Sequence, residues 1–490
     1  MLSSPNLPPE LWSETFKGLP NKALISLHAT SHQFHQIARP LLFGEFHFHP
    51  FHVQEGASSR YSDQLDVDRN TKRLEFWTSP AVAPFVRGCT FSAFCRSRDD
   101  PSPVFATFFR LLPNLCNLKE VNFVMVRFDR AAVQALCTLS NLARVQLTGC
   151  FCAMSQSEVV DLVLHVKSFR CADIASMSSA GAHRWLDILG KDTLHDLTLP
   201  SPPSPSLFRE GPIPNFPNLQ RLLLGIKAWS EIPLLSNFPA MRYLQVSWCP
   251  SYSRDDAQSQ QPVVLTQLDT YEGPDEVLLF IDPLTAPRRL NIAPCNPQLL
   301  LERFFTVRPV LRAVHQLILS LHYLQLDVLS SCLASLPSLR EIRMKVYHPF
   351  ADYTPLVSGD FHNRQTFFES LATRSPFPAT LEKLYVSWVA PAPTPDSHST
   401  LTLASAQAAR EALSAENNAL KCVWLATPEF EYLWIRDTDR PSQFNRTNFY
   451  QEIKEFMRSP KSVGGRDSRT RLGFVFPDSQ DPFVLRYTGA

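Results

Sequence analysis

Glycine is scarce in this sequence, and its scarcity argues against a large class of functions. The chain has 15 glycines among 490 residues, less than half of the usual share of roughly 7%. The one Gly-Lys pair, Gly190-Lys191, has Trp185 where a phosphate-binding loop needs glycine. The G-x-G-x-x-G, G-x-S-x-G and H-E-x-x-H patterns are also absent. We therefore expect a protein that is not an enzyme, with no catalytic residues and no cofactor.

Long apolar runs, a cysteine framework and an excess of one charge are missing as well. No stretch approaches the roughly 18 apolar residues that span a membrane, and the N-terminus has no basic start followed by an apolar run. The 11 cysteines include no C-x2-C pair, which argues against zinc and against a disulfide framework. Lys+Arg number 47 and Asp+Glu 46, so no overall field attracts nucleic acid or a membrane. We expect a soluble cytoplasmic or nuclear protein, or one found in both compartments.

What the chain does have is apolar residues, 44% of the total, enough to fold around a large core. Its first part, residues 7–43, has the pattern of three short helices. Pro8 and Pro9 suit a helix start, Pro20 ends that helix, Asn21 can cap a second and Ser31 a third. So short a segment cannot bury all of its apolar faces internally. We therefore predict that part of this apolar surface contacts a partner.

The same segment resembles the F-box, a helical module that docks the adaptor Skp1 in SCF-type (Skp1-cullin-F-box) ubiquitin ligases. The residues that carry the resemblance are, in order, Leu7-Pro8-Pro9-Glu10-Leu11, Phe16, Leu19-Pro20, Leu24, Leu27, Phe34 and Ile37-Ala38. The following Pro40-Leu41-Leu42-Phe43 is similar to F-box proteins of mushroom-type fungi. An N-terminal helical cap for the repeats behind it is the alternative interpretation.

The resemblance implies Skp1 as a partner and, through Skp1, a cullin ligase core. The Skp1-binding residues that it implies are Leu7, Pro8, Leu11, Phe16, Leu19, Leu24, Leu27 and Phe34. Histidines are also frequent in this segment, and His28, His32 and His35 would share one face of a continuous helix. Because Ser31 is expected to break that helix and no third-ligand spacing follows, we predict no metal site.

Beyond residue 80 a six-residue frame recurs, with apolar residues at its first, fourth and sixth positions. The fourth and sixth positions have the period of two that buries one face of a short strand. Clear copies begin at Leu118, Leu142, Leu194, Leu219, Met241, Val314, Leu339, Leu381 and Leu420, and weaker copies at Val86, Val166, Leu265 and Pro287. From 118 to 339 successive copies lie about 22–28 residues apart, which is the period of leucine-rich repeats.

These patterns predict an α/β fold: a small N-terminal helical F-box followed by an irregular leucine-rich-repeat solenoid with a parallel inner sheet. The expected division is 1–45 for the F-box, 46–80 for a linker, 81–430 for the solenoid, and 431–490 for a C-terminal cap and tail. Wider gaps after 339 place insertions within 345–380 and 390–420. The alternative is a mixed α/β domain whose leucine-rich sequence mimics the frame.

Taken together, the features favour a substrate-receptor subunit that recruits an unknown protein target to an SCF-type ubiquitin ligase through its repeats. An interaction scaffold that acts outside ubiquitylation is the alternative, and a cryptic hydrolase is a third possibility. The frame assigns positions three, five and seven to the open face of the sheet, where the later repeats are aromatic and cationic. Because such residues dominate interface hot spots, the expected target-binding residues are Tyr243, Arg343, Lys345, Lys383, Tyr385 and Trp424. Alternatively, the insertions and the tail fold over this face, and these side chains pack against them.

Overall fold

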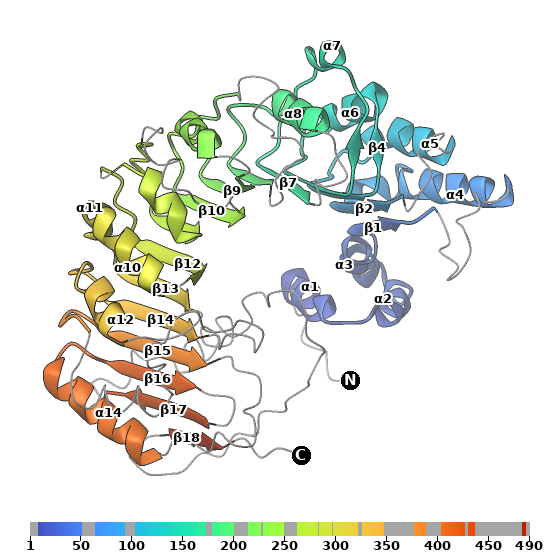
Figure 1. The fold of residues 1–490 in the computed structure, drawn as a ribbon. Helices are drawn as coiled ribbons and strands as arrows, with labels where there is room; N and C mark the ends of the chain where they lie inside the picture. The colour runs from blue at the N-terminus through green and yellow to red at the C-terminus, as the bar shows by residue number, and fades with distance from the viewer. Residues whose placement is uncertain are drawn as a thin grey trace, which may run out of the picture. The chain divides into compact units, whose positions relative to one another are not determined.

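A computed structural model gives the fold of the chain (Figure 1). The residues that it describes are 8–50, 64–93, 103–172, 179–199, 214–226, 229–248, 262–282, 284–295, 297–321, 326–346, 377–388, 403–426, 430–436 and 483–486. The chain divides into two units. The first comprises Met1–Leu268 with Phe280–Thr285, and the second comprises Asp269–Leu279 with Ala286–Ala490.

The chain begins with the three short helices that the sequence predicts. They are α1 (Pro9–Lys17), α2 (Asn21–His28) and α3 (His32–Leu42). Pro20 immediately precedes α2, and Asn21 is its first helical residue rather than its cap. The predicted cap at Ser31 is confirmed, because its side chain accepts a hydrogen bond from the Phe34 backbone N–H at 3.1 Å. The third helix packs against both of the others.

Residues 46–80, which we expected to be a linker, contain regular structure. The strand β1 (Glu45–Phe48) pairs in parallel with β2, and the helix α4 (Gln64–Trp77) follows. Phe46 and Phe48 are fully buried and alternate with exposed residues. One four-residue strand carries too few alternations to be recognised as a copy of the frame, and this is why the sequence does not reveal it.

In the first unit, parallel strands follow one another in chain order. After β1 they are β2 (Gly88–Ser92), β3 (Glu120–Val124), β5 (Arg144–Thr148), β7 (Ser168–Ala172), β8 (Asp196–Leu199), β9 (Arg221–Gly225) and β10 (Tyr243–Trp248). A small second sheet pairs β4 (Arg127–Phe128) with β6 (Phe151–Cys152). The connections contain η1 (Ala83–Phe85), α5 (Pro103–Leu111), η2 (Leu112–Asn114), α6 (Arg130–Cys137), α7 (Gln156–Val159), α8 (Ser179–Ile188) and η4 (Trp229–Asn237).

The second unit also has parallel strands in chain order, and it ends with two antiparallel strands. Its parallel strands are β11 (Thr270–Gly273), β12 (Arg289–Cys295), β13 (Gln316–Leu321), β14 (Glu341–Val346), β15 (Lys383–Trp388) and β16 (Cys422–Ala426). The last two, β17 (Phe430–Ile435) and β18 (Phe483–Arg486), run antiparallel to their neighbours. The connections contain η5 (Asp275–Phe280), α10 (Pro297–Thr306), α11 (Arg308–Leu311), α12 (Leu326–Leu333) and α14 (Leu403–Glu416). In Figure 1, α10, α12 and α14 line one face of this unit's strands.

The burial pattern follows the predicted frame. In β3, Val121 and Phe123 at the fourth and sixth positions are buried, whereas Glu120, Asn122 and Val124 are more exposed. The same alternation recurs in β5, β13 and β14. The predicted α/β fold, with short N-terminal helices followed by a leucine-rich-repeat-like solenoid, is therefore confirmed.

One weak copy of the frame is out of register. The sequence places its first position at Leu265, but Tyr271 pairs with Leu290, the fourth position of the next copy. The frame at β11 therefore starts at Leu268. Both leucines are buried, so apolar spacing alone does not distinguish the two registers.

Two kinds of hydrogen bond join neighbouring repeats. A carbonyl at the second frame position accepts two backbone N–H groups of the following repeat; that of Arg288, for example, accepts from His315 at 2.8 Å and Gln316 at 3.0 Å. In addition, a polar side chain directly before the frame reaches back to the preceding turn, as Asn141 Nδ2 does to the Cys116 carbonyl at 2.9 Å. Asn117, Asn218 and Thr380 make equivalent bonds. These bonds satisfy backbone groups that the turns would otherwise leave without partners.

Left-handed backbone recurs at one repeat position and provides a stability test. Met125 has φ 59° and Gly149, at the equivalent position one repeat later, has φ 60°. This conformation costs a residue with a Cβ about 1–2 kcal/mol, and glycine avoids the cost. Met125 is 42% exposed, so part of its packing is lost with the side chain, and we expect Met125→Gly to raise the free energy of unfolding by up to ~1 kcal/mol. Gly149→Ala should lower it by about 1–2 kcal/mol. Urea denaturation of both variants measures the change, and a destabilised Met125→Gly would contradict this account.

Candidate functional site

The N-terminal helices leave part of their apolar surface uncovered. Leu11 on α1 is 52% exposed, and Ile25 on α2 is 60% exposed. Pro8 is exposed, and Leu19, Leu27 and Phe34 are half-buried. Leu7 lies outside the described residues. The expected Skp1-binding residues that are accessible are therefore Pro8 and Leu11, with partial contributions from the three half-buried side chains.

Two residues expected on this surface are instead inside the three-helix segment. Phe16 and Leu24 are 2% and 4% exposed. The ring of Phe16 packs against those of Trp12 and Phe34, with centroids 5.8 Å and 5.2 Å apart. Phe16 and Leu24 therefore stabilise the segment and offer little surface to a partner. The F-box resemblance did not include Ile25. Leu24 and Ile25 are adjacent in a helix and point in different directions, so the burial of Leu24 leaves Ile25 at the surface.

Three histidines of the N-terminal helices, His28, His32 and His35, lie near the turn between α2 and α3. The helix break at Ser31 separates His28 from His32, as the sequence predicts. Across that break the rings of His28 and His35 lie 4.0 Å apart. Burial, and then the charges of His35 and Arg39, lower the pKa of His28. Within the part of the chain that the structure describes, no group of three or more His, Cys, Asp or Glu side chains is placed to hold a metal ion.

The expected target-binding residues are not one exposed surface. Strand register puts Arg343, Tyr385 and Trp424 in one row across β14, β15 and β16. However, Tyr385 and Trp424 are only 3% and 1% exposed, and they form a buried cluster with Cys422 and Ala426. Burial raises the pKa of the Cys422 thiol to about 12. These two aromatic residues are therefore core residues of the second unit and offer almost no surface to a partner.

Lys345 and Tyr243 are two further residues of the expected target-binding set. Lys345 is half-buried on β14, and burial lowers its pKa. Tyr243 belongs to the first unit, where the Arg221 guanidinium lies over its ring at 4.5 Å from the centroid. Neither of them lines the polar pocket described next.

Arg343 and Lys383 line a polar pocket of about 650 Å³ in the second unit. The pocket lies at the N-terminal ends of β11 to β15, and all of its lining residues except Arg343 are at the second or third frame position of their repeats. Its other cationic residues are Arg288, Arg289 and Arg340, its carboxylates are Asp269, Glu341 and Glu382, and its remaining members are His315 and Gln316. The sequence did not reveal this site, because its residues belong to repeats that are distant along the chain.

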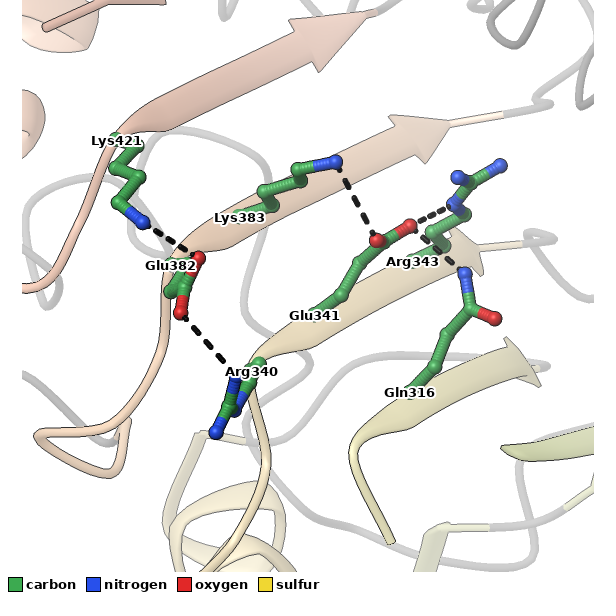
Figure 2. Close-up of polar contacts among 7 residues, drawn as sticks. All are labelled: Gln316, Arg340, Glu341, Arg343, Glu382, Lys383 and Lys421. Carbon is green, nitrogen blue, oxygen red and sulfur yellow. Dashed lines mark hydrogen bonds and ion pairs between the residues drawn. The ribbon is translucent and has the colours of Figure 1, made fainter. Parts of the chain in front are cut away.

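Figure 2 shows how two of the carboxylates are held. Glu341 accepts hydrogen bonds from Arg343 Nε at 2.5 Å and from Gln316 Nε2 at 2.9 Å, and Lys383 Nζ lies 3.8 Å away. Glu382 pairs with Lys421 at 2.8 Å and with Arg340 at 4.0 Å. Each of these carboxylates is thus flanked by two cationic side chains.

A second cluster of charges is buried elsewhere in the same unit. Arg303 on α10 pairs with Asp275 and, at 3.1 Å, with Glu276. Asp275 is 2% exposed. Its burial, reinforced by the charge of Glu276, raises the pKa of Asp275 to about 6 despite the nearby Arg303. Asp275 does not line the polar pocket, so the perturbed carboxyl group and the pocket do not form one catalytic arrangement.

The raised pKa of Asp275 predicts a pH-dependent stability. The folded chain binds this proton more tightly than the unfolded chain, so the stabilising contribution is present below about pH 4 and is lost as pH rises through about 6. The free energy of unfolding of the wild type should therefore fall between pH 4 and pH 7. In Asp275→Asn this fall should be smaller by about 2–3 kcal/mol. Urea denaturation at the two pH values measures it. Glu302→Gln, at an exposed position on α10 next to Arg303, is the control, and equal pH dependence in wild type and Asp275→Asn would contradict the prediction.

Across the helices that the structure describes, none has the length and hydrophobicity needed to cross a membrane.

Comparisons with known proteins identify a structural similarity but no family. No protein family model matches the chain, and no curated protein matches it. Among solved structures, the chain is similar to a structural genomics target from Bacteroides fragilis, with 10% identity and a TM-score of 0.32. That similarity covers 58% of this chain and 72% of the other.

Proposed function

We propose that this protein is a substrate-receptor subunit of an SCF-type ubiquitin ligase. In this proposal the three N-terminal helices bind Skp1, and Skp1 connects them to a cullin. The observation that carries the proposal is the uncovered apolar surface of these helices, in a segment whose residues follow the F-box pattern. Leu11 and Ile25 are more than half exposed there, and large apolar side chains gathered on one small module suggest an interface.

The proposed mechanism needs no catalytic residue in this chain. A receptor that holds the ligase at one end and a target at the other raises their effective concentration, which can reach the millimolar range. Ubiquitin transfer is then faster because the reacting groups are brought together and oriented. The repeats would hold the target, since solenoids of this kind present extended surfaces for binding.

Affinity purification tests the proposal and separates it from its alternative. The full-length tagged chain is co-expressed with Skp1 and a cullin, and the proteins that it retains are identified. Recovery of both partners supports the ligase assignment. Recovery of Skp1 without a cullin favours an interaction scaffold that acts outside ubiquitylation, and recovery of neither contradicts the F-box assignment.

A further inference from the structure

The polar pocket of the second unit carries more positive than negative charge. Five arginine and lysine side chains line it, against three aspartate and glutamate side chains. Glu341 and Glu382 already have cationic partners within the sheet. Among the described residues, the side chains of Arg288 and Arg289 have neither an ion-pair partner nor a hydrogen-bond partner, and both are exposed. Two guanidinium groups are therefore available to an anion.

Carboxylates in the pocket pair with its other cations. Glu341 orients Arg343 and Lys383, and Glu382 lies between Lys421 and Arg340 (Figure 2). Arg343, which is held by Glu341 and half-buried, loses less conformational freedom when a ligand binds. His315 adds a further polar atom, Nδ1, which is buried and has no hydrogen-bond partner. The pocket thus gathers several positively charged and polar groups.

The dimensions suit a short extended segment of a protein. From Asp269, directly before β11, to Lys383 on β15, the pocket spans four strand spacings of about 4.8 Å, or about 19 Å, which is the length of about six extended residues. Its volume of about 650 Å³ lies within the usual range for binding sites, roughly 300–1,000 Å³. Guanidinium groups pair with carboxylate and phosphate groups through two parallel hydrogen bonds.

The lining favours a peptide over a nucleic acid. Sites for single-stranded nucleic acid combine a continuous basic groove with aromatic side chains on which bases stack. No aromatic residue is among the ten described residues that line this pocket, and Asp269, Glu341 and Glu382 interrupt its positive charge. A peptide with spaced acidic side chains meets the arginines and avoids these carboxylates. A uniform phosphate backbone cannot do so.

We infer that this pocket is the site at which the repeats bind a protein target, and that the target supplies a short extended segment with anionic side chains. The inference rests on the proposed function for its biological meaning, and on the pocket alone for its chemistry. It places recognition at the N-terminal ends of β11–β15, rather than at the buried Tyr385 and Trp424.

Fluorescence anisotropy with the purified full-length chain tests the inference. The probe is a labelled peptide of about eight residues with glutamate at every second position, so that carboxylates on one side of the extended peptide lie about 7 Å apart. The same peptide with glutamine in place of glutamate should show no binding, and one with phosphoserine at those positions shows whether phosphate is preferred. We expect Arg288→Gln combined with Arg289→Gln to raise the Kd by about ten-fold or more, and added salt to weaken binding.

Two further variants separate recognition from damage to the fold. Arg312→Gln removes an exposed arginine of the same unit that does not line the pocket, and it should leave the Kd unchanged. Glu382→Gln removes a negative charge from the pocket and should lower the Kd of the acidic peptide by about three-fold or more. Damage to the fold would not strengthen binding, so this opposite effect is specific to the inferred site.

The outcomes also separate this inference from the proposed function. Undetectable binding of both anionic peptides, equal binding by the double arginine variant, or tighter binding of a single-stranded oligonucleotide of equal charge would overturn the inference. Tighter binding of the phosphoserine peptide, lost in the same double variant, supports it and identifies phosphate as the anion. The assay contains no ligase component, so loss of Skp1 binding with peptide binding retained contradicts only the proposed function.

Discussion

Leu11→Asp combined with Ile25→Asp is expected to abolish co-purification of Skp1 with the full-length chain. Both side chains are more than half exposed in the free protein, so aspartate at these positions should not unfold the helices. Full burial of an exposed apolar side chain contributes about 1.5–3 kcal/mol, and a partner would cover the roughly half of each side chain that is exposed, or about 1–2 kcal/mol each. Losing both should weaken the complex by about 2–4 kcal/mol, or roughly thirty-fold to several-hundred-fold in Kd, and the burial of two aspartate charges adds to this loss.

The controls for this experiment come from the same chain. Val160, after α7, is 78% exposed, and Val160→Asp introduces the same charge far from the N-terminal helices along the chain. It should leave Skp1 recovery unchanged. Phe16→Asp is unsuitable, because Phe16 is buried and its loss would unfold the three helices. Undiminished recovery of Skp1 by the Leu11 and Ile25 double variant would contradict the proposed interface.

The second large effect is expected at Trp424. Its side chain is 1% exposed in a cluster with Tyr385, Cys422 and Ala426, so Trp424→Ala should leave a cavity and cost about 3–5 kcal/mol of unfolding free energy. The melting temperature should fall by about 10 °C for a unit of roughly 200 residues. Thermal unfolding followed by circular dichroism measures the shift.

Leu299→Ala is the control for Trp424, because Leu299 lies on α10 of the same unit and is 44% exposed. Its melting temperature should stay close to that of the wild type. An unchanged melting temperature for Trp424→Ala, together with loss of target capture, would show that Trp424 contacts the target directly. It would also restore the sequence-based expectation that this residue belongs to the binding surface.

The sequence predicted the fold better than the site, for physical reasons. The frame repeats many times, so errors in single copies, such as the choice of Leu265 over Leu268, do not hide the period. The single strand β1 lacks this redundancy, and residues 46–80 were therefore interpreted as a linker. The period also tells which side of a strand a residue faces, and the register of Arg343, Tyr385 and Trp424 agrees with that.

Exposure on the open face could not be derived in the same way. The alternating pattern shows that Trp424 lies on the face of the sheet opposite the buried fourth and sixth frame positions. It does not show whether that face is itself covered. Likewise, the polar pocket depends on Arg288, Arg340 and Glu382 meeting across strands that the sequence separates by dozens of residues. Their proximity follows from the register, which becomes useful only when every repeat boundary is known.

The antiparallel pairing of β17 with β16 has a consequence for self-association. A row of like parallel strands that ended on β16 would offer an unpaired edge that matches the parallel strands of a second copy, and such edges promote templated growth into aggregates. Antiparallel partners place their hydrogen bonds in alternating narrow and wide pairs, whereas parallel partners space them evenly. Because β17 occupies the edge of β16 in an antiparallel pairing, the parallel hydrogen-bonding pattern stops there. A second copy therefore cannot add a parallel strand at β16.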